Sequence, residues 1–228
     1  MSNFQIAIDG PSGAGKSTVA KIVANQLNFI YVDTGAMYRS AALYGMRRGI
    51  DLTNEALVEA FIKNVDVILK NVGGGQIVLL NGEDITNKIR TQEVSGATSV
   101  ISKVNCVRQK MTALQRQYAD NYNVVMEGRD IGSVVLPNAQ VKIYLDASAS
   151  ARAERRFREL IGRGFEADFQ KIKSEVEQRD IADMNREISP LRRPDGKTYI
   201  ADYIDSSDMT AQEAAFAILN IVNKKLGV

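Results

Sequence analysis

The chain has 228 residues, of which 45% are hydrophobic and 25% charged, and its formal net charge is +2. These values predict a soluble globular protein of one domain, with or without an inserted subdomain. The absence of histidine and the single cysteine, Cys106, exclude a disulfide within the chain, a cysteine metal site and catalysis by a histidine base. The sequence has no signal-like N-terminus and no membrane-spanning apolar run, which predicts a cytoplasmic protein without a membrane partner.

The predicted elements alternate between strand and helix along the chain. The first predicted strand is Phe4–Asp9, and the others cover 29–32, 66–70, 76–81, 124–127, 141–146 and 203–205. The predicted helices cover 18–27, 34–48, 55–64, 93–101, 107–118, 150–161, 169–186 and 211–226. This alternation predicts a parallel sheet covered on both faces. The β-rich runs around Gly73–Gly75 indicate a hairpin that interrupts it, so residues 60–90 are predicted to lie within an inserted subdomain.

Residues Gly10–Ser17 read G-P-S-G-A-G-K-S and complete the Walker A pattern between the first strand and the first helix. In such a loop the backbone N–H groups and the helix dipole point at one spot, which suits phosphate. Lys16 is then expected to reach the β- and γ-phosphates, and the Ser17 hydroxyl a Mg²⁺ ion. A glycine-rich turn without a ligand is the weaker alternative. The sequence therefore predicts a nucleoside triphosphate site formed by Gly10, Pro11, Ser12, Gly13, Ala14, Gly15, Lys16, Ser17 and Thr18.

Two segments that follow strands are candidates for a second substrate site. In Asp33–Arg39, Thr34 is predicted to cap a helix whose first turns carry Arg39, a side chain able to meet an anion. An ordinary cap with a surface arginine is an equal alternative. Glu127–Asp130 ends another strand, where α/β proteins bind ligands. Taken alone, that segment is better explained as a surface turn with a local ion pair.

Two arginine groups are predicted to lie on helix faces. Arg179, Asp183 and Arg186 share one helical stripe, which suits either surface ion pairing or recognition of a phosphate and sugar hydroxyls. The second group is predicted to form a cationic lid over triphosphate, with a solvated face as the alternative, and consists of Arg152, Arg155, Arg156 and Arg163. Arg158 points elsewhere on the same helix.

Six stretches together resemble the nucleoside monophosphate kinases, and specifically the bacterial cytidylate kinases. They are I-D-G-P-S-G-A-G-K-S, D-T-G-A-M-Y-R, I-R-T-Q-E-V, G-R-D-I-G-S-V-V, K-I-Y-L-D-A and R-D-x-x-D-x-x-R, and they cover essentially the whole chain. The resemblance implies a P-loop kinase fold, a parallel sheet flanked by helices with an inserted monophosphate-binding subdomain and a short lid. The expected core covers residues 1–34, 104–147 and 166–228, the insert about 35–103 and the lid about 148–165.

The resemblance also implies the reaction ATP + CMP ⇌ ADP + CDP, with dCMP as a further acceptor and Mg²⁺ as the metal. It implies that Arg39, Arg129 and Arg179 hold the CMP phosphate and that Asp183 and Arg186 lie near the sugar. Ser99, Arg108 and Asp130 would read cytosine, and Thr34 is a further candidate for substrate binding. Lys16, Arg156 and Arg163 are the expected catalytic cations, with Arg152 and Arg155 on the ATP phosphates. The expected partners are these small molecules, and the expected state is a monomer.

Three other classes of protein are alternatives to this resemblance. A kinase for UMP or AMP is the nearest, although uracil would present an acceptor to Asp130 where cytosine presents an amino donor. A GTPase switch lacks its guanine-reading N-K-x-D, because Asn87 and Lys88 continue as Ile89 and Arg90. An ATPase dependent on nucleic acid would need a broad basic surface or aromatic platforms, and this chain is 7% aromatic without tryptophan.

Overall fold

A five-stranded parallel sheet forms the centre of the computed structural model, which describes residues 3–73, 75–162 and 164–227. Its strands are β1 (Gln5–Asp9), β2 (Ile30–Asp33), β6 (Val124–Gly128), β7 (Val141–Asp146) and β8 (Asp202–Asp205). They are ordered β2-β6-β1-β7-β8, so β1 is hydrogen-bonded on both sides. The parallel sheet predicted from the alternation of strands and helices is confirmed.

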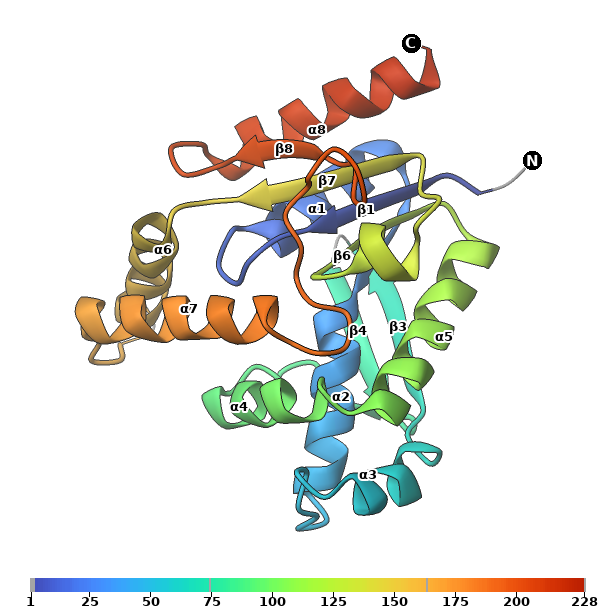
Figure 1. The fold of residues 1–228 in the computed structure, drawn as a ribbon, viewed down its shortest axis with the longest axis vertical. Helices are drawn as coiled ribbons and strands as arrows, with labels where there is room; N and C mark the ends of the chain where they lie inside the picture. Colours follow the sequence, from blue (N-terminus) through green and yellow to red (C-terminus); the bar gives the residue numbers. More distant parts are fainter. Residues whose placement is uncertain (1–2, 74, 163, 228) are drawn as a thin grey trace.

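Helices cover both faces of this sheet, because successive strand residues point to opposite sides. Ile6 and Ile8 pack with α1 (Lys16–Leu27) and α8 (Ala211–Leu226) on one face. Ala7, between them, joins the opposite core, which includes residues of α2 (Thr34–Met46) and α5 (Asn105–Asn121). Both faces of the sheet are therefore buried, and helices lie on either side of it (Figure 1).

A second, smaller sheet interrupts the alternation between α2 and α5. It is antiparallel and consists of β3 (Val67–Val72), β4 (Gly75–Leu80) and β5 (Glu83–Asp84). Its inward-facing side chains join the core beneath α2, together with α3 (Glu55–Ile62) and α4 (Gln92–Ile101). The hairpin predicted around Gly73–Gly75 is confirmed by the pairing of β3 with β4, although Gly74 itself lies outside the described residues.

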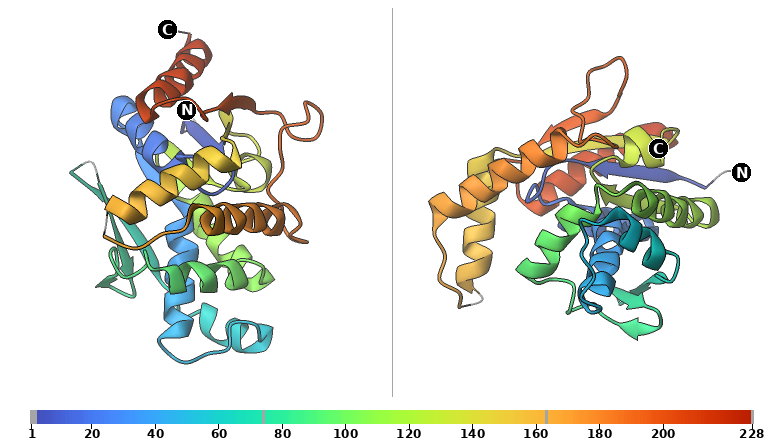
Figure 2. Two further views of the ribbon diagram at one scale, coloured as in Figure 1. Left: turned by 90° about the vertical axis from the view of Figure 1, so that its left-hand side faces the viewer. Right: turned by 60° about the horizontal axis from the view of Figure 1, so that its bottom comes forward.

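Helices α6 (Ala149–Gly162) and α7 (Phe169–Met184) pack against each other and project from one end of the sheet (Figures 1 and 2). Helix α6 ends at Gly162, one residue later than predicted, and Arg163 lies outside the described residues. Helix α7 ends two residues earlier than predicted, so Arg186 follows the helix instead of lying on it. None of the helices in the described part of the chain combines the length and apolar character that a bilayer crossing requires.

Two local features differ from the sequence prediction. Asp33, and not Thr34, caps α2: its carboxylate accepts from the backbone N–H of Ala36 at 2.8 Å. Thr34 is the first helical residue, and its hydroxyl donates to the carbonyl of Glu127 at 2.7 Å. Ile131–Val135 form a short π-helical turn, η1, which the apolar run of that segment did not indicate.

Candidate active site

The phosphate loop runs from Gly10 to Gly15 and leads directly into α1. Gly10 has a φ of 149°, and a Cβ atom there would lie 2.0 Å from the carbonyl oxygen of Leu145, so only glycine fits. Gly15 is the N-cap of α1 and no side chain caps that helix end, which leaves its first N–H groups available to an anion. Lys16 and Ser17 are the first two residues of the helix.

Lys16 is buried, and its ammonium group donates to the carbonyl of Pro11 at 2.7 Å. Burial, assisted by the nearby Arg129 guanidinium, lowers the pKa of Lys16 to about 7. An anion bound in the loop would favour the protonated form of Lys16, because its negative charge opposes the effects of burial and of Arg129. The loop therefore holds a cation that is costly to keep charged until a ligand arrives.

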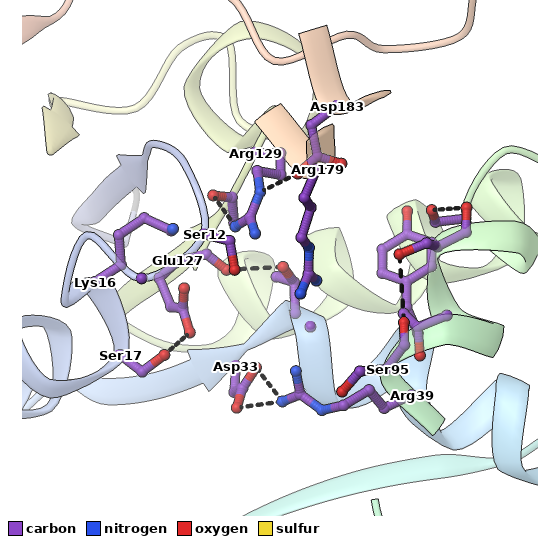
Figure 3. A pocket seen from close by; sticks show the side chains of 18 of the residues that line it. Ser12, Lys16, Ser17, Asp33, Arg39, Ser95, Glu127, Arg129, Arg179 and Asp183 are labelled. Carbon is purple, nitrogen blue, oxygen red and sulfur yellow. Dashed lines mark hydrogen bonds and ion pairs between the residues drawn. The ribbon is translucent and has the colours of Figure 1, made fainter. Parts of the chain in front are cut away.

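Glu127 at the end of β6 belongs to a segment predicted for the second substrate site, but its contact with the phosphate loop was not predicted. Its carboxylate accepts from the Ser17 hydroxyl at 2.6 Å and from the Tyr31 hydroxyl at 3.3 Å. Figure 3 shows Ser17 and Glu127 facing each other below Lys16. The one signal in the sequence is the position of an acid at the end of a buried strand. It does not reveal that the carboxylate meets the phosphate loop.

One cavity of about 480 Å³ brings the two halves of the site together. The predicted residues that line it are Ser12, Gly13, Gly15, Lys16, Ser17, Thr18, Thr34, Arg39, Ser99, Arg108, Arg129, Asp130, Arg152, Arg155, Arg156, Arg179, Asp183 and Arg186. Gly10, Pro11 and Ala14 do not line it: they shape the loop from behind, with the Ala14 carbonyl accepting from the Ser206 hydroxyl. Arg163 lies outside the described residues.

Three arginines converge in the centre of the cavity. Arg129 pairs with Asp183 at 2.8 Å, and Arg39 pairs with Asp33 at 3.0 Å. Arg179 points between them (Figure 3) and has no ion-pair partner in the described part of the chain; its buried Nε makes no hydrogen bond. Burial and the charge of Arg129 lower the pKa of Arg179 to about 10. The centre therefore has an uncompensated cation and favours an anion such as phosphate.

Asp130 lies deeper in the same cavity, in a buried ion pair with Arg108. Arg186 is 4.0 Å from its second oxygen, and Arg108 also donates to the carbonyl of Ser102 at 3.1 Å. Ser99 stands at the rim, where its hydroxyl donates to the carbonyl of Ser95. A carboxylate and a guanidinium side by side offer one acceptor and several donors to a planar polar ligand.

Helix α6 supplies arginines to the opposite wall. Arg152 is buried, donates to the carbonyl of Ser12 at 3.0 Å and pairs with Asp180 of α7 at 2.5 Å. Arg155 donates to Ser206, and Arg156 pairs with Glu159 at 2.8 Å. Arg158 is absent from the cavity lining; its side chain is 77% exposed and pairs with Glu154. Arg152, Arg155 and Arg156 therefore face the cavity and Arg158 faces away, as their predicted positions around the helix indicate. Arg152, however, already contacts Ser12 and Asp180.

Comparison by sequence matches the chain to one family model and to relatives that bear its name. Residues 6–224 match the family described as cytidylate kinase. A cytidylate kinase from Geobacillus sp. (strain WCH70) is 46% identical over 99% of both chains. A cytidylate kinase from Bacillus subtilis (strain 168) is 44% identical over 97% of both chains.

Similarity to solved structures is more distant and concerns the fold alone. A gluconokinase from Sinorhizobium meliloti 1021 has a TM-score of 0.50 at 15% identity, covering 98% of this chain and 95% of that one. TT1252 from Thermus thermophilus has a TM-score of 0.50 at 17% identity, covering 99% of both. The sheet order, the phosphate loop and these likenesses identify a P-loop kinase fold. With 46% identity over almost its full length to a curated member, the chain belongs to the cytidylate kinase family of enzymes.

Proposed function

We propose that this protein transfers the γ-phosphoryl group of ATP to the phosphate of CMP, and also to that of dCMP. The observation that carries the proposal is the Arg179 guanidinium between Arg39 and Arg129, across one cavity from the phosphate loop. Its Nε is buried and makes no hydrogen bond within the described part of the chain. Two anionic groups bound at these places would face each other. The names of the relatives supply the identity of the acceptor.

The loop residues would hold the triphosphate through the backbone N–H groups at the start of α1, with Lys16 turned from the Pro11 carbonyl toward the phosphates. Ser17 and Glu127 fit a magnesium ion, because the pair offers a hydroxyl and a carboxylate and leaves other positions to water and phosphate. When bound, Mg²⁺ neutralises charge on the transferring phosphoryl group and orients it.

Arg39, Arg129 and Arg179 would hold the acceptor phosphate, with Asp183 and Arg186 near its sugar. Asp130 would accept from the cytosine amino group while Arg108 donates to the ring acceptors. No side chain has to act as a strong base, because the acceptor phosphate is already anionic near neutral pH. The residues contribute position and charge, with Arg156 on α6 completing the cationic wall.

Several expectations are part of this proposal. Residues 35–103 act as the monophosphate-binding insert and 148–165 as a lid, and their closure excludes water from the phosphoryl group. The working form is a monomer in the cytoplasm that uses small-molecule substrates and no nucleic acid. Arg163, which lies outside the described residues, belongs to the proposed lid on the basis of its predicted helical spacing with Arg152, Arg155 and Arg156 and of the resemblance.

ADP formation from MgATP, measured against a panel of nucleoside monophosphates, tests the proposal. Fast turnover is expected with CMP and dCMP, with slower use of UMP. Efficient turnover of AMP or GMP together with no turnover of CMP would reject it. An Arg179→Met variant serves as a control: it should lose transfer while ATP still binds, since Arg179 lies on the acceptor side.

A further inference from the structure

A buried carboxylate that the proposed mechanism does not use joins three distant segments behind the active site. Asp9, the last residue of β1, is fully buried. Its Oδ1 accepts from the backbone N–H of Ile131 at 2.7 Å. Its Oδ2 accepts from the backbone N–H of Gly132 at 2.8 Å and from the hydroxyl of Tyr199 at 2.9 Å. Such a set of donors requires an acceptor on both oxygens.

The amides that Asp9 holds begin the π-helical turn η1, and the two residues before that turn are Arg129 and Asp130. The same backbone therefore positions the guanidinium facing the acceptor phosphate and the carboxylate facing the base. Little slack exists around the turn: a Cβ atom on Gly132 would lie 3.1 Å from the Tyr199 hydroxyl and 3.2 Å from Cδ of Lys142. A displacement of the turn would move Arg129 and Asp130 with it.

We propose that Asp9 and Tyr199 are positioning residues for the acceptor half of the active site, which they fix by holding the turn at Ile131 and Gly132. The inference rests on the proposed function, because it takes Arg129 and Asp130 as acceptor-binding residues. This role differs from a general role in folding because losing it should affect the acceptor half of the site and leave the phosphate loop in place. β1 is hydrogen-bonded between β6 and β7, so the phosphate loop keeps its anchor when the Asp9 contacts are lost. The turn is also held at its far end, where Arg116 donates to the carbonyls of Val134 and Val135 at 3.0 Å, but at its start the amides of Ile131 and Gly132 donate to Asp9.

The charge state of Asp9 provides an additional readout. Burial raises the pKa of Asp9 to about 6, and the negative charge of Asp130 adds to this rise. The amides of Ile131 and Gly132 and the Tyr199 hydroxyl oppose it, and Lys16 is the nearby cation. A proton on the Asp9 carboxylate would face the N–H and O–H groups that now donate to it, so at least one of these hydrogen bonds would be lost. Acceptor binding should therefore weaken as the pH falls below about 6.

Two substitutions test the proposal, with a matched control. Asp9→Asn keeps the shape but puts an NH₂ group against an N–H or O–H donor. Tyr199→Phe removes only one hydrogen bond. Tyr203→Phe is the control, since its hydroxyl also donates to an aspartate at 3.0 Å, but that aspartate is Asp146 at the end of β7 and not the one that holds the turn.

For Asp9→Asn the KM for CMP should rise about ten- to a hundredfold, the size expected for losing a hydrogen bond to a charged group. For Tyr199→Phe it should rise about three- to tenfold, and for Tyr203→Phe by less than twofold. In all three proteins the KM for ATP should change by less than about twofold. Deuterium exchange of a peptide covering residues 128–135, measured without substrate, should be faster in the first two variants only.

The phosphate of CMP also titrates near pH 6, but it does so equally with every variant. Comparing the pH profiles of the KM for CMP between variants therefore isolates the titration of Asp9. Loss of the Tyr199 donor removes support from the carboxylate, so Tyr199→Phe should shift the acid limb to higher pH. An unshifted limb, equal rises in the KM values for ATP and CMP, or unchanged exchange of residues 128–135 would each overturn the proposal.

Should Asp9→Asn not fold, Tyr199→Phe decides alone. The rate of the wild-type protein with CMP tests the proposed function. The ratio of KM between each variant and the wild type tests the positioning role, and it can be measured with whichever monophosphate the wild type uses.

Discussion

Lys16 is expected to take up a proton when ATP binds. Its pKa is lowered to about 7 by burial and by Arg129, so at pH 8 most of the ligand-free protein has a neutral amine there. Triphosphate beside it favours the charged form and raises the pKa. Calorimetric titration with MgATP at pH 8, in buffers of different ionisation enthalpy, should give a proton uptake of about 0.5 to 1 per site.

A Lys16→Arg variant is the control for this uptake, because arginine is charged before and after binding. It should bind ATP with almost no dependence of the observed enthalpy on the buffer. An equal buffer dependence in both proteins would assign the proton to another group. Lys16→Met should also lose phosphoryl transfer while keeping its fold.

Asp130→Asn should reduce the use of CMP and narrow the gap between CMP and UMP. The carboxylate is proposed to accept from the cytosine amino group, whereas an amide can turn its NH₂ toward O4 of uracil. The ratio of kcat/KM values for CMP and UMP should fall by about ten- to a hundredfold.

The alternative for Asp130 is that it only orients Arg129, in which case both substrates would lose efficiency equally. The structure disfavours this, because Arg129 pairs with Asp183 while Asp130 pairs with Arg108. Steady-state measurement of both substrates in both proteins decides the question. An unchanged ratio would remove Asp130 from base recognition.

At the scale of elements, the ion pair of Arg152 and Asp180 links α6 to α7 and, through Ser12, to the phosphate loop. Breaking such a buried pair costs about 3 to 5 kcal/mol. For a domain of this size, Arg152→Ala should therefore lower Tm by about 6 to 20 °C. Thermal unfolding followed by circular dichroism, without substrate, measures the effect.

Arg158→Ala on the same helix is the matched control for this prediction. Its exposed pair with Glu154 spans one helical turn and contributes about 0.3 to 0.5 kcal/mol. The expected fall in Tm is only about 1 to 2 °C. Similar shifts in the two variants would show that Arg152 does not connect the helices.

The strands and helices were largely predictable from the sequence, because the parallel strands are apolar runs bounded by polar residues and the helices have clear periodicity. The sequence did not predict local details for which two neighbouring residues or two conformations are equally suitable. Asp33 and Thr34 both have a side chain able to cap α2, and only the structure assigns the cap to Asp33. The turn at Ile131–Val135 has an apolar composition that also suits a strand. Arg186 follows the end of α7, where no strong stop signal stands.

The candidate site was predictable where a motif names its residues, as in the phosphate loop. The roles of Glu127, Asp9 and Asp180 were not predicted because they depend on partners far along the chain. Glu127 meets Ser17 110 positions away, and Asp9 meets Tyr199 190 positions away. Burial gives these carboxylates their importance, and burial of one acidic residue cannot be deduced from its neighbours in sequence.

For the whole molecule, the concentration of positive charge in the cavity should limit the stability of the substrate-free protein. Arg179 is a half-buried cation beside Arg129; its Nε is buried, and it lacks an ion-pair partner among the described residues. Arg179→Met keeps much of the volume and removes this cost. We expect the free energy of unfolding to rise by about 0.5 to 2 kcal/mol and Tm by about 1 to 8 °C.

Ligand distinguishes this prediction from a general gain in packing. Saturating CMP at about 100 times its Kd should stabilise the wild type by about 2.7 kcal/mol and leave the Arg179→Met variant almost unchanged. The order of the two Tm values should then reverse. A variant that is less stable than the wild type without ligand would contradict the argument, as would an equal response to CMP.

The position of β1 at the centre of the sheet has a consequence for synthesis of the chain. Both of its partners follow late: Ile6 pairs with Val125 and Val141, and β1 begins beside a segment 119 positions away. At about 5 to 20 residues per second, the ribosome needs roughly 6 to 24 s to make the first partner. During that time Ile6 and Ile8 have no strand beside them. The nascent chain should therefore be most vulnerable to aggregation, and most dependent on chaperones, before residue 125 leaves the ribosome.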